Sequence, residues 1–344
     1  MTSMTDNPLD INEFLKKSHA LPVFDVRSPA EYNHGHFPGA ANLPLFTNEE
    51  RSIVGTLYLQ KGSKDAMMKG LELIGPRMKG FVQQAMDLAP GGEVLLYCWR
   101  GGMRSSSMAW LLNTAGVRAH VLSGGYRAYR RFVLAWFEVP VWLIVLAGFT
   151  GTGKTEVVEV LENRGQQVIH LERLASHKGS VFGNIGMDQQ PTTEHFENLL
   201  FGCMASFDPQ QPVFIEDESL SIGRVFIPRP LYKQMKAAWH IELEVPLAQR
   251  LNRLENDYTR VDNSLLVNGI RRLEKRLGSE HAAAAIRSIE EGNMQAAMVP
   301  VLKYYDKLYA RSMDLHNPRV TRLSVGSENP GEIADQIISL TKTG

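Results

Sequence analysis

One glycine-rich stretch restricts the folds open to this chain more than any other feature. Residues 148–155 match the pattern G-x-x-x-x-G-K-[ST], with the apolar run Val141–Ala147 before them and a helical pattern, Lys154–Arg164, after them. A buried strand, a glycine-rich turn and a helix in this order predict a parallel α/β unit. At such a turn, backbone N–H groups and the helix N-terminus face a bound phosphate.

Several residues of this stretch are candidate phosphate ligands. The glycines allow backbone amides to approach phosphate oxygens, the lysine brings positive charge to the terminal phosphate, and the threonine hydroxyl suits Mg²⁺. The candidates are Gly148, Gly151, Gly153, Lys154 and Thr155.

A second apolar run, Val213–Glu216, ends at the first of three successive acids, which are Glu216, Asp217 and Glu218. An acid at the end of a neighbouring strand can hold a metal-bound water beside Thr155. Asp217 is our candidate, although the choice among the three acids stays open, and Mg²⁺ is a candidate cofactor. No base-reading pattern such as N-K-x-D is found, so the ligand can be a nucleotide, a small phosphate compound or a diphosphate.

A cysteine lies in a second loop of the strand-loop-helix type. The segment CWRGGMRS, residues 98–105, follows the apolar run Glu93–Cys98 and precedes the helical pattern Ser105–Ala115. Backbone N–H groups in such a loop surround the sulfur and lower the pKa of its thiol, so we expect Cys98 to be a catalytic thiolate. The glycines permit a tight, left-handed backbone. The expected cradle consists of Arg100, Gly101, Gly102 and Arg104.

Alternating strand and helix patterns predict two α/β domains. Apolar runs at Leu21–Val26 and Val117–Leu122, with the one before Cys98, predict strands of a first parallel sheet. The alternation restarts after Pro140, and the pattern becomes mainly helical from Pro246. The 344 residues suit two domains, which we expect at residues 1–137 and 138–344, the second with a helical C-terminal part.

Composition favours a cytoplasmic, water-soluble protein. The formal net charge is zero, so any binding of nucleic acid must rest on a local patch. Only two cysteines occur, which indicates a reducing compartment, and Cys203 shares a helical spacing with apolar residues and fits a core position. The N-terminal segment lacks the pattern of a signal peptide. The most apolar stretch, residues 133–149, contains Glu138 and Pro140 and is too short to span a membrane.

The cysteine loop resembles the active-site loop of the rhodanese superfamily, and a second stretch agrees. Residues 25–32 (DVRSPAEY) and 35–40 (GHFPGA) are similar to a signature of that superfamily. We expect structural roles for its polar residues Asp25, Arg27 and Glu31. The fold that we predict is therefore a rhodanese-like parallel-sheet domain followed by a P-loop NTPase-like α/β domain.

The combination of the two domains resembles the tRNA 2-selenouridine synthases over almost the whole chain. Family-like stretches include GTLY at 55–58, SGGYRA at 123–128, LERLA at 171–175, HKGSVFG at 177–183, IEDES at 215–219 and VPVL at 299–302. Three positions depart from the pattern: Leu59 stands where lysine is common, Lys178 where arginine is usual, and Arg173 where glycine occurs.

The resemblance implies a substrate and two donors. The substrate would be wobble 2-thiouridine in tRNA, whose sulfur is geranylated from geranyl diphosphate and then replaced by selenium from selenophosphate. Cys98 would be the covalent selenium carrier, and the P-loop residues would hold the diphosphate or selenophosphate. The implied partners are tRNA, the small phosphorylated donors and an enzyme that supplies selenophosphate. We expect no association with a membrane.

Several contacts stay open at this point. His177 and Lys178 are candidate phosphate or substrate contacts, although a structural His177 is equally compatible with the pattern. Basic residues that interleave with acids in the helical region form either an RNA track or a solvated face: Arg250, Arg253, Arg260, Arg271, Arg272, Lys275 and Arg276. The alternative function is a rhodanese-type sulfurtransferase fused to a nucleotide-hydrolysing module.

Overall fold

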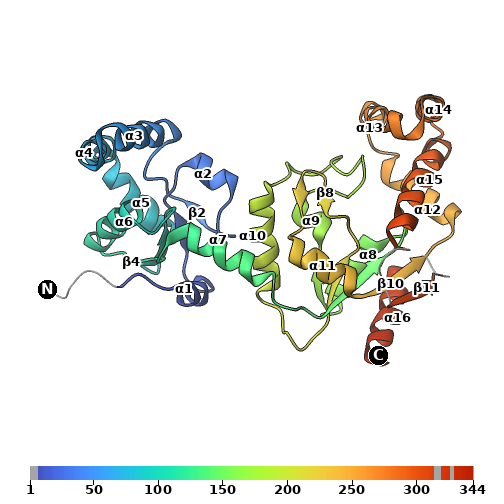
Figure 1. Cartoon of the computed structure of the whole chain (residues 1–344), viewed down its shortest axis with the longest axis horizontal. Helices are drawn as coiled ribbons and strands as arrows, with labels where there is room; N and C mark the ends of the chain where they lie inside the picture. Colours follow the sequence, from blue (N-terminus) through green and yellow to red (C-terminus); the bar gives the residue numbers. More distant parts are fainter. Residues whose placement is uncertain (1–6, 314–318, 326–328, 344) are drawn as a thin grey trace. The chain divides into compact units, whose positions relative to one another are not determined.

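The computed structural model describes residues 7–313, 319–325 and 329–343 (Figure 1). The chain forms two compact units, Met1–Trp136 and Phe137–Gly344. The division falls one residue before the boundary expected from the sequence. Each unit is built around a parallel β-sheet, as the alternating patterns predict.

The sheet of the first unit has four parallel strands in the order β2-β1-β3-β4. Phe24 pairs with Leu96, and Leu96 pairs with Val121. Because successive side chains of a strand point to opposite faces, these apolar strands supply a core on each face of the sheet. The strands are β1 (Val23–Asp25), β2 (Ala41–Asn42), β3 (Glu93–Tyr97) and β4 (Arg118–Val121).

Helices pack on this sheet in two groups, in which α1 contacts α7 and α5 contacts α6. The helices predicted after the second and third strands are present as α6 and α7. The helices α3 to α5 were not expected. The sequence of α3 lacks a clear apolar stripe, and the helix accordingly has no fully buried side chain. The helices are α1 (Ile11–Ser18), α2 (Pro29–His34), α3 (Asn48–Lys61), α4 (Ser63–Ile74), α5 (Met78–Leu88), α6 (Met103–Thr114) and α7 (Gly125–Trp136), with a 3₁₀ turn at Gly75–Arg77.

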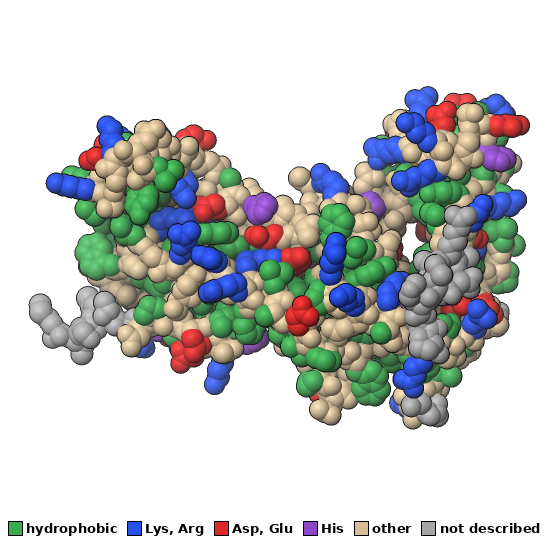
Figure 2. All heavy atoms as spheres, viewed as in Figure 1, with side chains coloured by type: hydrophobic (Ala, Val, Ile, Leu, Met, Phe, Trp, Pro, Cys, Tyr) green, Lys and Arg blue, Asp and Glu red, His purple; other side chains and the backbone are tan. Residues whose placement is uncertain are grey.

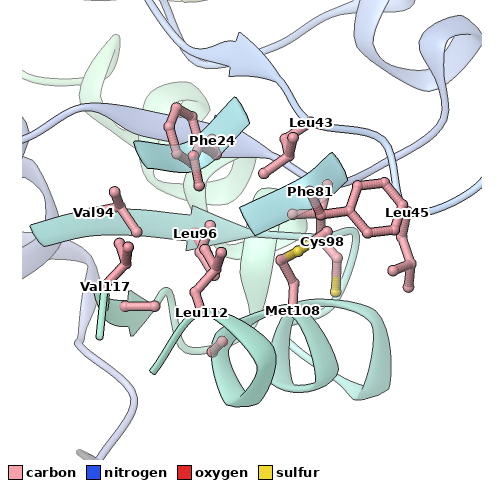
Figure 3. Close-up of a cluster of buried hydrophobic side chains, with 14 of the residues drawn as sticks. Phe24, Leu43, Leu45, Phe81, Val94, Leu96, Cys98, Met108, Leu112 and Val117 are labelled. Carbon is pink, nitrogen blue, oxygen red and sulfur yellow. The ribbon is translucent and has the colours of Figure 1, made fainter. Parts of the chain in front are cut away.

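An apolar core lies between β1, β3, α5 and α6 (Figure 3). Leu96 of β3 and Met108 of α6 are fully buried in it, and Phe81 of α5 is buried in the same cluster. Cys98 belongs to the same cluster, directly after β3. The loop that carries the thiol is therefore fixed at one end by the packing of the core.

The loop between β3 and α6 packs against the loop between β4 and α7. Gly101 and Gly125 both have left-handed backbones, with φ of 66° and 57°. A Cβ on Gly101 would lie 2.6 Å from the carbonyl oxygen of Leu122, and a Cβ on Gly125 would collide with the carbonyl oxygen of Cys98. The backbone N–H of Tyr126 donates to that same oxygen at 2.8 Å. Only glycine permits this approach of the two loops.

We expect Gly125→Ala to destabilise the first unit by about 3 kcal/mol or more, because a backbone clash adds to left-handed strain. Gly92 is the matched control, since it is also left-handed (φ 68°) but has open space around its Cβ position. There, alanine should cost only about 1 kcal/mol. Hydrogen exchange of the β3 amides measures both changes. Equal costs at the two positions would show that the loops do not constrain each other.

The sheet of the second unit has five parallel strands in the order β11-β10-β5-β7-β6. The predicted strand after Pro140 is the central β5, which has β7 on one side and β10 on the other. The sequence pattern did not predict the edge strand β11. This strand follows a long helical region, and only every second side chain of it is partly buried, so its sequence has no apolar run. The strands are β5 (Leu143–Ala147), β6 (Gln167–Ile169), β7 (Val213–Glu216), β10 (Trp239–Glu244) and β11 (Val320–Ser324), and a separate antiparallel hairpin is formed by β8 (Ser221–Ile222) and β9 (Val225–Phe226).

Helices α8 and α16 cover one face of this sheet, where Leu161 and Ile337 pack against Phe214. A second cluster of apolar side chains joins α12 to α15 in a helical region, as the sequence pattern after Pro246 predicts. The helices of this unit are α8 (Lys154–Asn163), α9 (Leu171–Ala175), α10 (Thr193–Met204), α11 (Arg229–Ala237), α12 (Leu247–Tyr258), α13 (Asn263–Leu277), α14 (Ser279–Glu290), α15 (Met294–Met313) and α16 (Pro330–Thr343).

Among the described residues, no helix combines the length and the apolar character that crossing a bilayer requires.

Candidate functional site

The thiol of Cys98 lies in the loop between β3 and α6 and is almost fully buried. Its Sγ is 3.2 Å from the hydroxyl oxygen of Ser105 and 3.9 Å from the carbonyl oxygen of Gly102. Ser105 is fully buried in the first turn of α6, so its hydroxyl has a fixed position beside the sulfur. The N-terminal end of this helix therefore faces the sulfur, as the sequence predicts.

Opposing effects act on the pKa of the Cys98 thiol. Burial raises it, but hydrogen bonds from the Ser105 hydroxyl and from the backbone N–H groups of Ser105 and Arg100 lower it, as does the charge of Arg104. The result is a pKa below the ordinary value of a cysteine. A thiolate is the nucleophilic form of cysteine, and the geometry therefore provides a reactive sulfur.

The residues of the predicted cradle act in different ways. Arg100 contributes its backbone N–H, whereas its side chain is exposed. Gly101 has the left-handed backbone that was expected, but Gly102 does not: its φ is −100°, and its carbonyl oxygen lies 3.0 Å from the Ser105 hydroxyl oxygen. The left-handed backbone expected at Gly102 is therefore absent, because a single left-handed residue completes the turn into α6.

Arg104 is held by a residue of the other signature stretch. Its two terminal nitrogens donate to the carboxylate of Glu31 at 2.7 and 3.2 Å. Burial raises the pKa of Glu31, but the hydrogen bonds and charge of Arg104 outweigh it and lower the pKa. Glu31 also accepts from the backbone N–H of Ser28, at the start of α2. This carboxylate therefore fixes an arginine beside the thiol, beyond the local structural role that the sequence indicated.

Asp25 and Arg27 have the structural role that was expected. Both side chains are buried, and the terminal nitrogen of Arg27 lies 2.6 Å from the carboxylate of Asp25 and 2.6 Å from the carbonyl oxygen of Gly35. The guanidinium also lies 3.8 Å from the centre of the Tyr126 ring. This pair ties β1 to the loop after α2, because a buried charge is stable only when it is paired and hydrogen-bonded.

The glycine-rich loop of the second unit connects β5 to α8. Gly151 and Gly153 have left-handed backbones, with φ of 82° and 83°, as a tight phosphate-binding turn requires. The ammonium of Lys154 donates to the carbonyl oxygen of Gly148 at 2.6 Å. The loop thus has its lysine folded over the turn, where a phosphate oxygen can replace the carbonyl as its acceptor.

Three glutamates cluster beside this loop. The Thr155 hydroxyl donates to Glu172 at 3.3 Å, and the backbone N–H of Glu172 donates to Glu216 at 3.0 Å. Burial first, and then the charge of Glu172, raises the pKa of Glu216 to about 7. Burial raises the pKa values of Glu172 and Glu218 as well. Glu172 was not singled out as a site residue, although it lies in the LERLA stretch and could have been found there.

Asp217, the acid chosen from the sequence, makes other contacts. Its carboxylate pairs with Lys236 at 3.2 Å, and its carbonyl oxygen accepts from the Tyr309 hydroxyl at 2.6 Å. Asp217 lines the same cavity as Thr155, but the carboxylate hydrogen-bonded to the Thr155 hydroxyl is that of Glu172. Among the described residues, no group of three or more His, Cys, Asp or Glu side chains is arranged to hold a metal ion.

Residues of the phosphate loop, Thr150 to Thr155, line a cavity of about 580 Å³. Lys178 lines this cavity, as expected for a phosphate contact, whereas His177 does not. The His177 ring lies close to Gly183 and Gly223, and burial lowers its pKa. The lining also includes an aromatic wall, defined by Tyr232, Tyr258, Tyr305 and Tyr309, together with Leu254 and Leu308. Tyr309 lies close to the loop, with its ring centre 5.8 Å from the Lys154 ammonium.

The basic residues of the helical region fall into two groups. Arg250 is buried and joins the phosphate loop to α15, because it donates to the carbonyl oxygen of Thr150 at 2.8 Å and to the carboxylate of Asp306 at 2.6 and 2.9 Å. Arg253 lies beside Gly153 and 3.6 Å from Glu156. Both arginines therefore contact the backbone of the glycine-rich loop, at the carbonyl oxygens of Thr150 and Gly151. Of the basic residues singled out from the sequence, the following have exposed side chains: Arg260, Arg271, Arg272, Lys275 and Arg276.

We expect iodoacetamide to alkylate Cys98 with a pH midpoint below about 8.5, the ordinary value of a cysteine. A Cys203→Ser background leaves one thiol, and burial raises the pKa of Cys203 to about 11 in any case. Replacement of Ser105 by alanine removes a hydrogen bond to the thiolate and should raise the midpoint by about one pH unit. Mass spectrometry of the labelled chain gives the rate. An unchanged midpoint in Ser105→Ala would show that the hydroxyl does not stabilise the thiolate.

The affinity of the loop for inorganic diphosphate should depend on Glu216. Because its pKa is about 7, this carboxyl gains negative charge as the pH rises from 6 to 8, and the charge repels a bound anion. The matched variant Glu216→Gln keeps the oxygen that accepts from Glu172. Relative to this variant, the wild-type chain should lose about fivefold more affinity between pH 6 and pH 8. Calorimetry without divalent metal measures the difference, and parallel pH profiles would contradict the proposed effect.

Family comparisons agree with these two sites. The family model described as "Rhodanese-like domain" matches residues 10–131, and the one described as "tRNA 2-selenouridine synthase AAA domain" matches residues 141–330. The first match contains the thiol loop, and the second contains the phosphate loop, the helical region α12 to α15 and the edge strand β11.

Three curated proteins named "tRNA 2-selenouridine synthase" are similar to most of this chain. The protein of Nitrosomonas eutropha is 34% identical over 90% of this chain and 79% of its own length. That of Shewanella frigidimarina is 38% identical over 72% and 69%. That of Pseudomonas fluorescens is 33% identical over 91% and 94%. With both domains matched in order and two relatives aligned over 79% and 94% of their own length, this chain belongs to the tRNA 2-selenouridine synthase family.

Proposed function

We propose that this chain is a transferase that converts wobble 2-thiouridine of tRNA into 2-selenouridine, with geranyl diphosphate and selenophosphate as donors. One observation carries the proposal: a chain of this family holds both a thiol of lowered pKa and a phosphate loop whose cavity is lined in part by tyrosine rings. Neither sulfur transfer alone nor nucleotide hydrolysis alone requires this combination.

The second unit is suited to the geranyl transfer. The diphosphate would bind the N–H groups of the phosphate loop and Lys154, and the ten-carbon chain would lie against the aromatic wall near Tyr305 and Tyr309. The sulfur of 2-thiouridine attacks C1 of the geranyl group, so a C–S bond forms and the C–O bond to diphosphate breaks. The N3 proton of the base passes to solvent. The loop assists because it stabilises the charge that develops on the departing diphosphate.

A magnesium ion that accompanies the diphosphate would find two oxygen ligands here, the Thr155 hydroxyl and the Glu172 carboxylate. Mg²⁺ commonly takes only one or two ligands from the protein and the others from phosphate and water. Such an ion would neutralise charge on the leaving group, and it would also hold Glu172 in its ionised form.

The first unit is suited to the exchange of sulfur for selenium. The Cys98 thiolate attacks the selenium of selenophosphate, an S–Se bond forms, and the Se–P bond breaks with its electron pair leaving as phosphite. The terminal selenium then attacks C2 of the base and displaces geranylthiolate. A small cellular thiol attacks the Cys98 sulfur, which releases 2-selenouridine and leaves a mixed disulfide that a second thiol reduces. Direct attack by selenophosphate followed by hydrolysis would instead release phosphate, so ³¹P NMR distinguishes the carrier role from direct attack.

The tRNA requires a local basic surface, because the net charge of the chain is zero. We assign this contact to the exposed basic side chains of α13, among them Arg271 and Lys275. We place the reaction in the cytoplasm, where reduced thiols and tRNA are both present. An enzyme that makes selenophosphate is the partner we expect.

Two variants should separate the half-reactions. Cys98→Ser should abolish formation of 2-selenouridine while S-geranyl-2-thiouridine still accumulates, because the phosphate loop is intact. Lys154→Ala should lower geranylation by about 100-fold, since a charge that stabilises the leaving group is lost. Cys203→Ser is the matched control and should retain both steps. Nucleosides from a thiolated tRNA incubated with both donors are measured by mass spectrometry.

Two results would overturn the proposal. One is the absence of both geranylated and selenium-containing nucleosides with the wild-type chain and active reagents. The other is release of phosphate from ATP, without tRNA, at a rate that Cys98→Ser leaves unchanged and Lys154→Ala abolishes. That second result would favour a sulfurtransferase fused to a nucleotide-hydrolysing module.

A further inference from the structure

An apolar groove of about 550 Å³ lies in the first unit, apart from the cavity of the phosphate loop. Its walls come from α3, α4 and the first turns of α6, none of which carries the thiol itself. The apolar side chains that define it are Val54, Tyr58, Leu59, Met67, Leu71 and Met103. Its volume falls in the range of about 300–1,000 Å³ that is typical of small-molecule sites.

The groove exposes large apolar side chains to solvent. Leu59 is 85% exposed, Met103 is 62% exposed and Leu71 is 54% exposed. Hydrophobic side chains reach the surface in the region where α3 and α4 lie (Figure 2). A contiguous apolar surface of this kind marks a binding site more often than it marks an ordinary surface.

Residues of the first two turns of α6 connect the groove with the thiol loop. Met103 and Arg104 line it, and they directly precede Ser105, whose hydroxyl contacts the Cys98 sulfur. Ser107, two residues after Ser105, also lines it. On α6, therefore, the side chain of Ser105 contacts the sulfur while residues on both sides of it in sequence form the wall of the groove.

The charge at the groove also suits a nucleic-acid substrate. Its described lining contains Arg51 and Arg104 but no carboxylate. Arg104 is oriented by Glu31, and Arg51 lies 3.7 Å from the same carboxylate. A ligand with an apolar chain and a polyanionic remainder would place the chain in the groove and its phosphates near these arginines.

We propose that this groove binds the geranyl chain of S-geranyl-2-thiouridine while the selenium is transferred. The inference rests on the proposed function, because that function brings a geranylated base to Cys98. In the displacement at C2, the bond to selenium forms, the bond from C2 to sulfur breaks, and geranylthiolate leaves. The groove holds this leaving group and so orients C2 toward the thiol loop. The same ten-carbon chain therefore has two sites on the molecule, the aromatic wall for transfer and this groove for displacement.

The test compares two adjacent methionines of α4. Met67 lines the groove, whereas Met68 does not and is 58% exposed. The substrates are anticodon stem-loop RNAs that contain S-geranyl- or S-methyl-2-thiouridine, and selenophosphate is the donor for the full-length chain. The wild-type chain should have a KM about tenfold lower for the geranylated RNA than for the methylated RNA.

Met67→Glu should raise the KM for the geranylated RNA about tenfold, with a small change in kcat, and leave the KM for the methylated RNA unchanged. Met68→Glu should behave like the wild-type chain. Leu71→Ser, which also lies in the groove, serves as a second variant. The rate of Cys98 alkylation checks that each variant keeps the fold of the first unit.

The outcomes separate the inference from the proposed function. If the wild-type chain makes no 2-selenouridine from geranylated RNA, the proposed function itself is wrong. If the wild-type chain is active but Met67→Glu and Leu71→Ser match Met68→Glu on both substrates, the groove does not bind the geranyl chain. An equal loss on geranylated and methylated RNA would assign the groove to another occupant, such as a protein partner, and would also overturn the inference.

Discussion

Backbone N–H groups at the start of a helix stabilise the negative charge of the Cys98 thiolate, and the second unit has a loop of the same strand-loop-helix type. In the first unit, the N–H groups of Arg100 and Ser105 lower the pKa of the Cys98 thiol against the effect of its burial. In the second unit, the glycine-rich loop and the N-terminus of α8 form the site that we propose for a phosphate. In both cases a parallel sheet ends at the loop, so the charge lies where strands and helices converge.

Contacts from distant parts of the chain hold both loops in place. Glu31 fixes Arg104 beside the thiol, and Arg250 joins the phosphate loop to Asp306 of α15. These contacts are charge-assisted and largely buried, and for this reason they are stronger and more specific than surface ion pairs. The cluster of glutamates has the opposite effect, since each of its members has a raised pKa and would repel an anion when ionised.

The proposed chemistry explains why both units present apolar surface. Alkylation of the base sulfur turns it into a leaving group, which the selenium nucleophile can displace, but the alkyl chain must be kept out of water at each step. We assign this role to the aromatic wall of the second unit and to the groove of the first unit. Under this proposal a single prenyl chain occupies two sites in turn, each beside a loop of the strand-loop-helix type.

The sequence by itself determined the two parallel sheets, the thiol loop and the phosphate loop, because each depends on a pattern within a short segment: an apolar strand, a glycine turn and a helix. Only the tertiary structure decided which residues meet at these loops. Glu31 and Arg104 are 73 positions apart, and Arg250 and Thr150 are 100 apart. The groove needs three helices that share no motif, and β11 forms a strand only because β10 offers it an edge. Such contacts arise from packing, which a local pattern does not encode.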